Sequence, residues 1–240
     1  MNGTIQSVLS SKPSAIVARS TTHLFLSLLT VMLAIQAAHG QTRAPVHSAD
    51  QIWIEPQFAV PLHDRIDLVL LGNFHFGRSA ERPVAEHAST GMGVSAKIGK
   101  YVVVFPFFMH FENQTAGPIR SKEERLTLEA AIKVPWRRFF LSYRQRFEYH
   151  WRTPPPNFIH ERNRFQIDRP LGVHGLTAFL ADEVFYDTHF HGWTRNRAYL
   201  GISKRVNKHF TFDVYYLRQN DGRSHPGDLN VVGSTLKFRL

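Results

Sequence analysis

The chain has 240 residues, and 29 Lys and Arg against 19 Asp and Glu give it a formal net charge of +10 at pH 7. The absence of cysteine excludes disulfide bonds, thiolate metal sites and a cysteine nucleophile. The basic residues are spread along the chain rather than clustered, which argues against a nucleic-acid-binding surface and favours contact with anionic lipids or solutes.

The first 40 residues have the pattern of an export signal. Lys12 and Arg19 precede an apolar run over residues 24–35, and small residues favour cleavage between Gly40 and Gln41. The run is shorter than the roughly 20 residues that a membrane-spanning helix requires. We therefore expect a cleaved, Sec-type signal peptide rather than an N-terminal anchor.

Residues 51–240 are expected to form one domain of β-strands. No linker or charge block divides them after the signal peptide (1–40) and a short extension (41–50). Alternation between turn signals predicts no helix and eleven strands, at 51–60, 65–76, 87–98, 101–113, 123–134, 138–151, 158–169, 175–187, 194–205, 209–219 and 228–240. An antiparallel barrel closes only with an even number of strands, so we expect a closed up-and-down barrel of 10–12 strands, and twelve in the first instance.

The segment 138–151 shows the alternation most clearly. Apolar and aromatic side chains such as Tyr149 occupy one face, and charged ones such as Glu148 occupy the other, because successive side chains of a strand point to opposite sides. Pro106 lies in a run that breaks this pattern and cannot donate a ladder hydrogen bond. We expect a bulge or an irregular edge there.

The connections are expected to alternate in length. Gly99 and Lys100 form one of the tight links, whereas 78–86 and 220–227 are longer connections at the other end. Short periplasmic turns and longer extracellular loops are typical of bacterial outer-membrane barrels.

The last strand places Leu236, Phe238 and Leu240 on one face and ends with the chain. It is similar to the C-terminal assembly signal of outer-membrane barrels, although a leucine replaces the usual terminal aromatic residue. We therefore expect the barrel-assembly machinery to be one partner, and outer-membrane lipid and lipopolysaccharide to be the others. We expect a monomer, and no nucleic acid among the partners.

Alternation alone leaves the direction of the charged faces open. A soluble, lipocalin-like barrel would put its apolar faces inside. Tyrosines and Trp151 towards strand ends resemble the aromatic girdles of membrane barrels, and facing strands combine arginines with carboxylates that could pair inside a lumen. We therefore predict a lumenal charge network of Arg125, Glu129, Arg144, Arg146, Glu148, Arg162, Arg164, Glu183 and Arg197.

The chain resembles the outer-membrane-type barrels catalogued as domain of unknown function 2490, over approximately residues 51–240. The segments that carry this resemblance are Trp53, Tyr143-Arg-Gln-Arg146, Arg162-Asn-Arg164-Phe165, Glu183-Val-Phe185, Asn196-Arg197 and Tyr215-Tyr-Leu-Arg-Gln219. The resemblance implies a closed antiparallel barrel in a Gram-negative outer membrane, with no established activity.

No motif in the sequence indicates a defined chemistry. Ser142 and His150 share a strand face, but eight residues of strand span more than about 20 Å, so they cannot form a catalytic dyad. His189 and His191 with Asp187 lack companion ligands, and we expect neither a metal nor a cofactor.

The expected function is therefore that of an exported outer-membrane barrel of unassigned role, either structural or a narrow, porin-like conduit for small polar or anionic solutes. A soluble periplasmic ligand-binding barrel is the alternative. A lipid-modifying outer-membrane enzyme is less well supported, and we expect no enzymatic activity.

Overall fold

The computed structural model describes residues 48–79, 82–114, 120–153, 156–172, 174–223 and 227–240. The predicted signal peptide, the Gly40–Gln41 cleavage site and most of the predicted extension lie outside these residues. Within the described ranges, no helix has the length and apolar character needed to cross a membrane.

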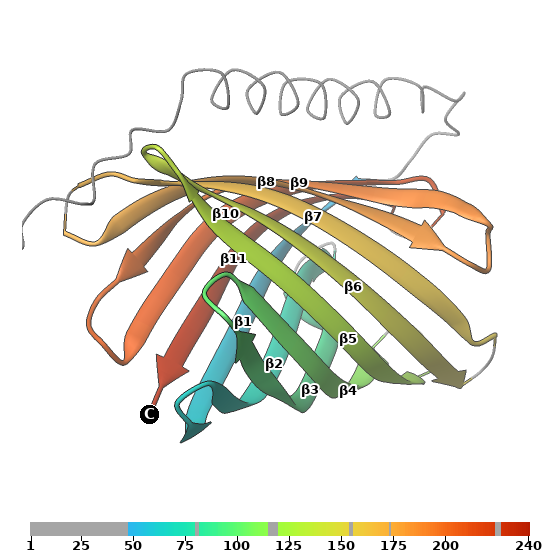
Figure 1. The fold of residues 1–240 in the computed structure, drawn as a ribbon. Helices are drawn as coiled ribbons and strands as arrows, with labels where there is room; N and C mark the ends of the chain where they lie inside the picture. Colours follow the sequence, from blue (N-terminus) through green and yellow to red (C-terminus); the bar gives the residue numbers. More distant parts are fainter. Residues whose placement is uncertain (1–47, 80–81, 115–119, 154–155, 173, 224–226) are drawn as a thin grey trace, which may run out of the picture. The chain divides into compact units, whose positions relative to one another are not determined.

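The described residues form eleven strands, and each corresponds to one of the eleven segments predicted from alternation (Figure 1). The strands are β1 (Ser48–His63), β2 (Ile66–Ser79), β3 (Arg82–Ile98), β4 (Val102–Gln114), β5 (Arg120–Trp136), β6 (Phe139–Thr153), β7 (Phe158–Pro170), β8 (Leu176–Asp187), β9 (Gly192–Arg205), β10 (Phe210–Asp221) and β11 (Asp228–Arg239). They close into a barrel in sequence order, with β11 returning to β1.

The expectation of twelve strands is wrong, because the barrel closes through one parallel pair. Neighbouring strands are antiparallel all round the barrel except at β1 and β11, which run in the same direction. Their register extends from Ser48 opposite Asp228 to Ala59 opposite Arg239. An odd number of up-and-down strands brings the first and last strands together in the same direction, and a parallel ladder satisfies both edges. This seam replaces the strand that an all-antiparallel barrel would need.

The predicted difference in connection length is smaller than expected. β2 extends to Ser79 and β3 begins at Arg82, so the region 78–86 belongs almost entirely to paired strand. Backbone pairing continues there beyond the part of the sequence that alternates cleanly.

The predicted bulge at Pro106 is not present as a change in register. The β3–β4 ladder is interrupted between the pairs Gly93–Phe107 and Ala96–Val104, and the same register resumes on either side. The missing N–H of proline accounts for the gap without an inserted residue.

An aromatic cluster fills part of the interior where β1 and β8–β11 meet. Its buried members are Trp53, Phe179, Ala181, Tyr199, Tyr215, Leu217, Leu229 and Val231. Gly201 and Gly233 allow the rings to lie against the strands: a Cβ at Gly201 would be 2.7 Å from the Cβ of Tyr215, and one at Gly233 would overlap the Tyr215 ring. Glycine is therefore required at both positions by close packing.

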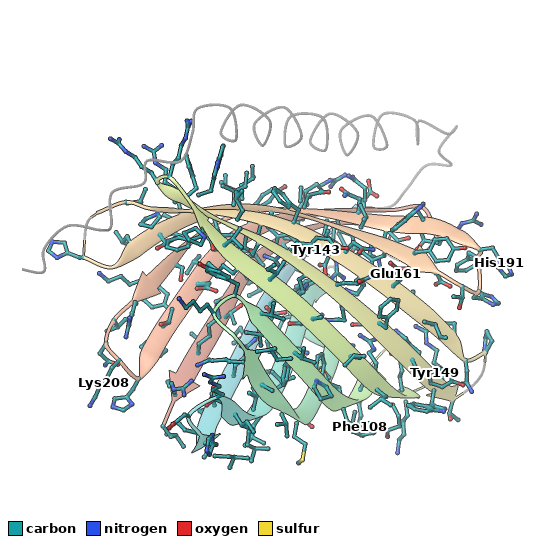
Figure 2. All side chains as sticks on the ribbon, viewed as in Figure 1. Phe108, Tyr143, Tyr149, Glu161, His191 and Lys208 are labelled. Atoms are coloured by element: carbon teal, nitrogen blue, oxygen red, sulfur yellow. The ribbon has the colours of Figure 1, made fainter. Side chains whose placement is uncertain are left out.

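The outer face of the barrel is mostly apolar. Phe108, Tyr143 and Tyr149, labelled in Figure 2, belong to it. Other exposed apolar side chains on this face include Ile52, Leu126, Leu128, Ile132, Phe147, Leu180, Leu200, Ile202, Val214 and Val232.

A hydrogen-bonded polar cluster on β6 and β7 interrupts this apolar surface. The Tyr143 hydroxyl donates to Asn163 Oδ1 at 2.5 Å, and the amides of Gln145 and Asn163 each donate to Glu161 Oε1 at 3.1 Å. Tyr143 and Glu161 are labelled in Figure 2. These bonds link the four polar side chains to one another.

Candidate functional site

The nine predicted lumen residues lie on the inward faces of the five adjacent strands β5–β9. Eight of them line the interior cavity, and the ninth, Glu183, is fully buried among them. The strand register aligns seven of them in two cross-strand rows, one of Glu129, Arg146 and Arg162 and one of Arg144, Arg164, Glu183 and Arg197. Arg125 and Glu148 lie outside these rows.

Glu183 is the best-enclosed carboxylate of this network, with 0% of its surface exposed. Arg144 Nη2 donates to its Oε1 at 2.6 Å, and Arg162 approaches the same oxygen through Nη2 at 3.0 Å and Nε at 3.1 Å. The Tyr199 hydroxyl donates to Oε2 at 3.0 Å. A buried carboxylate is tolerated only with such a complete set of donors.

Glu129 and Glu148 pair with Arg146, Arg162 and Arg125. Arg146 donates to Glu129 Oε2 through Nη2 at 2.5 Å and through Nε at 2.8 Å. Arg162 donates to Glu148 Oε1 at 2.8 Å, and Arg125 Nη1 is 3.5 Å from Oε2. Arg162 therefore links Glu148 to Glu183 and joins the two rows into one network.

Sequence reasoning missed a second group of inward residues around Glu123. This buried carboxylate accepts bonds from Arg125 Nη2 at 2.5 Å and Arg152 Nε at 2.6 Å, and it lies 2.7 Å from His150 Nδ1. Glu123 lies two residues before Arg125 on the same strand face, so alternation could have identified it. Its partners depend on the β5–β6 register and could not be identified in that way.

Asp187, considered from the sequence together with His189 and His191, has another role. Its Oδ2 lies 2.8 Å from His160 Nε2, and its Oδ1 accepts the backbone N–H of His189 at 2.7 Å. Asp187 therefore orients an inward-facing histidine of the neighbouring strand.

Two predicted arginines have no carboxylate partner within the described ranges. Arg164 Nη2 donates to Gln166 Oε1 at 2.8 Å, and its guanidinium lies 4.2 Å from the centre of the Tyr199 ring. Arg197 Nε donates to Gln219 Oε1 at 2.8 Å. In the part of the chain that the structure describes, neither arginine has a carboxylate oxygen within 4.0 Å. Both guanidinium groups keep donors that can bind an anion.

The wall next to the arginines, on the neighbouring strand β4, is apolar and aromatic. Phe107, Met109 and Phe111 of β4 are buried against one another there. Arginines reach towards this wall: the guanidinium of Arg125 lies 4.0 Å from the centre of the Phe111 ring, and that of Arg146 lies 5.2 Å from the centre of the Phe107 ring. These cation–π contacts hold the long side chains against the β4 wall.

The interior cavity has a volume of about 1550 Å³ and is predominantly cationic. Thirteen Lys and Arg side chains line it, against six Asp and Glu. The excess of cationic side chains remains when the buried carboxylates that pair with lining arginines are included, namely Glu123, Glu183 and Asp221. The lumen can therefore attract and hold small anions.

The fold and the interior define this chain as a closed β-barrel with a charged lumen. Residues 50–230 match the family described as "Protein of unknown function (DUF2490)", and the chain belongs to that family, which confirms the predicted resemblance.

Among solved structures, the chain is similar to an anion-selective porin from Comamonas acidovorans, with 12% sequence identity and a TM-score of 0.36. The similarity covers 70% of this chain and 56% of the porin chain, so the barrel spans about half the length of that protein. No curated protein sequence matches the chain.

Proposed function

We propose that this protein is an outer-membrane β-barrel that binds small anions in its lumen and conducts them. The observation that carries the proposal is the pair of lumenal arginines, Arg164 and Arg197, which have no carboxylate partner among the described residues and lie in a cavity with an excess of cations. Basic side chains lining a pore favour anions, and guanidinium groups match planar or tetrahedral oxyanions with paired donors. No catalytic role is part of this proposal.

The distribution of polarity supports placement in a membrane. Large apolar side chains cover most of the outer face, whereas the inward positions include many carboxylates and arginines. A soluble, lipocalin-like carrier would need the opposite arrangement, with an apolar interior and a solvated outer face. Lipid, including lipopolysaccharide, is then the partner of the outer face, and the proposed location is the bacterial outer membrane.

The location is tested by expressing the chain with its signal and fractionating the cells. We expect the mature protein in the outer-membrane fraction, with a gel mobility that differs between unheated and heated samples. A protein that is soluble in the periplasm without detergent would refute the membrane placement and support the soluble carrier.

Conduction is tested with purified, folded barrel in planar lipid bilayers under a KCl gradient. We expect single-channel currents whose reversal potential shows preference for chloride. The double variant R164Q/R197Q should lose much of this preference, whereas R138Q, an exposed position in the β5–β6 turn, should keep it. A folded barrel without conductance would overturn the conduit and leave a structural role. Unchanged selectivity in the double variant would refute the role of the two arginines in anion preference.

A further inference from the structure

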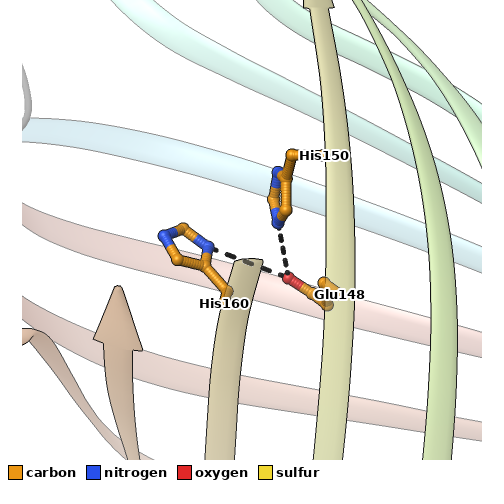
Figure 3. Close-up of side chains that lie close together, drawn as sticks. All are labelled: Glu148, His150 and His160. Atoms are coloured by element: carbon orange, nitrogen blue, oxygen red, sulfur yellow. Dashed lines mark ion pairs between the residues drawn. The ribbon is translucent and has the colours of Figure 1, made fainter. Parts of the chain in front are cut away.

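Glu148, His150 and His160 come together on the inner wall of the barrel (Figure 3). Glu148 and His150 are two residues apart on the inward face of β6, and His160 lies directly opposite Glu148 on β7. His150 Nε2 is 3.4 Å from Glu148 Oε2, and His160 Nδ1 is 4.0 Å from the same oxygen. One potential ligand atom from each residue lies within 4.8 Å of the other two.

Each imidazole is oriented by a second carboxylate on its other nitrogen. His150 Nδ1 lies 2.7 Å from Glu123 Oε1, and His160 Nε2 lies 2.8 Å from Asp187 Oδ2. An ionised carboxylate favours the N–H tautomer at the nitrogen that it contacts, which leaves the lone pair on the other nitrogen. The two nitrogens left with a lone pair, His150 Nε2 and His160 Nδ1, are the ones that lie near Glu148 Oε2. Carboxylates that support histidines in this way are the usual outer partners of metal-binding imidazoles.

The Nε2 atom of His150 provides an independent indication of a missing ligand. The His150 side chain is 1% exposed, and this nitrogen is buried without a hydrogen bond. A buried polar atom without such a partner is unfavourable, and each one in a folded protein calls for an explanation. A cation between the three side chains would provide one.

The surrounding arginines leave the necessary oxygen of Glu148 available. Arg162 and Arg146 approach Oε1, at 2.8 and 3.4 Å. Arg125 is 3.5 Å from Oε2, but its closer partner is Glu123, at 2.5 Å. A metal ion on Oε2 can therefore bind while Oε1 keeps its arginines.

We propose that Glu148 Oε2, His150 Nε2 and His160 Nδ1 form a binding site for a divalent transition-metal ion, with Zn²⁺ as the best-matched ion. Two imidazoles and one carboxylate suit zinc-class ions better than Mg²⁺ or Ca²⁺, which prefer oxygen ligands. Bonds of about 2.1 Å in a tetrahedron place ligand atoms about 3.4 Å apart, so a small movement of His160 completes the geometry. All three side chains also line the cavity, so we expect water or a small anion to reach the fourth position.

The test uses the mature barrel, purified in detergent through a tag without histidine and freed of metal with a chelator. Zn²⁺ affinity is measured by competition with a chromophoric chelator, and Co²⁺ is added separately to record its visible absorption. We expect one Zn²⁺ per chain at this site and the strong visible bands of four-coordinate Co²⁺. Heat-shifted gel mobility confirms that each variant is folded.

The variants H150A and H160A should each weaken Zn²⁺ binding by at least about tenfold and abolish the Co²⁺ bands. D187N should weaken binding about tenfold, because His160 loses its ionised partner. The control H209A removes a cavity-lining histidine that lies outside the proposed site, between β9 and β10. It should leave the Zn²⁺ affinity and the Co²⁺ spectrum unchanged. If H150A does not fold, H160A and D187N still test whether these side chains bind the metal ion. Unchanged affinity and spectrum in a folded H160A barrel would overturn the proposal and make the cluster a purely structural ion-pair network.

Discussion

Replacing Leu128 with arginine tests directly whether the outer face meets lipid. Leu128 is the ninth of the 17 residues of β5, and 52% of its surface is exposed on the outer face. If the strand spans a bilayer, this position lies near the midplane, where a lipid-facing arginine costs about 2–4 kcal/mol in a barrel. Leu128→Arg should therefore lower the free energy of unfolding by that amount.

Ile132 provides a matched comparison on the same face of the same strand. It lies four residues further along, about 13 Å by the usual rise per residue. With a strand tilt of about 40°, this places it about 10 Å from the midplane, close to the edge of an apolar band roughly 25 Å tall. Ile132→Arg should then cost only about 0–1 kcal/mol.

The assay is urea titration of barrels folded into phospholipid vesicles, followed by tryptophan fluorescence and gel mobility. A graded loss, larger for Leu128→Arg than for Ile132→Arg, is the expected result. On a water-exposed face both substitutions would stay within about 0.5 kcal/mol of the parent protein. That outcome would refute the assignment of this face to lipid.

Three further predictions concern the interior and the seam. Glu183→Gln should destabilise the barrel by about 3 kcal/mol in the same titration, because Arg144 and Arg162 lose a buried charged partner. The control is Glu124→Gln, at a part-exposed pair with His110, which should cost less than about 1 kcal/mol. In this cysteine-free chain, the double variant I54C/S234C should form a disulfide across the parallel seam, because the two positions are register partners. The disulfide should change the gel mobility, and reductant should reverse that change. A failure to form it would argue against the β1–β11 register. Gly201→Val should strongly reduce the yield of folded, heat-shifted barrel, because the Cβ of the valine would be 2.7 Å from the Cβ of Tyr215. An unchanged yield would contradict the close packing of Tyr215 against Gly201.

The strands could be predicted from the sequence because a period of two is a local property. All eleven segments were identified in this way, and the error in strand number came from the assumption that every neighbouring pair is antiparallel. Nothing local in Ser48–His63 or Asp228–Arg239 indicates a parallel partner, because that pairing joins residues about 180 positions apart. The extent of the β2–β3 hairpin was underestimated for a related reason, since backbone pairing does not require alternating side chains.

The lumen residues could be predicted as a set, but their pairing could not. Alternation placed Arg144, Glu148 and Glu183 on inward faces, whereas the specific contacts depend on cross-strand register. The histidines were harder to identify, because His150 and His160 lie ten residues apart and meet only when β6 and β7 pair. Histidine occurs 14 times in the chain, so without the strand register too many pairs of histidines are possible neighbours.

The parallel seam also has a consequence for sidedness. Because β1 and β11 run in the same direction, Ser48 begins the barrel at one end and Leu240 follows its last strand at the other. In a barrel with an even number of strands, both ends of the chain emerge on the same side. If this barrel spans the outer membrane with its C-terminus in the periplasm, an epitope inserted just before Ser48 should be accessible to antibody on intact cells, and one after Leu240 should not. The odd number of strands would thus place Ser48 and Leu240 in different compartments.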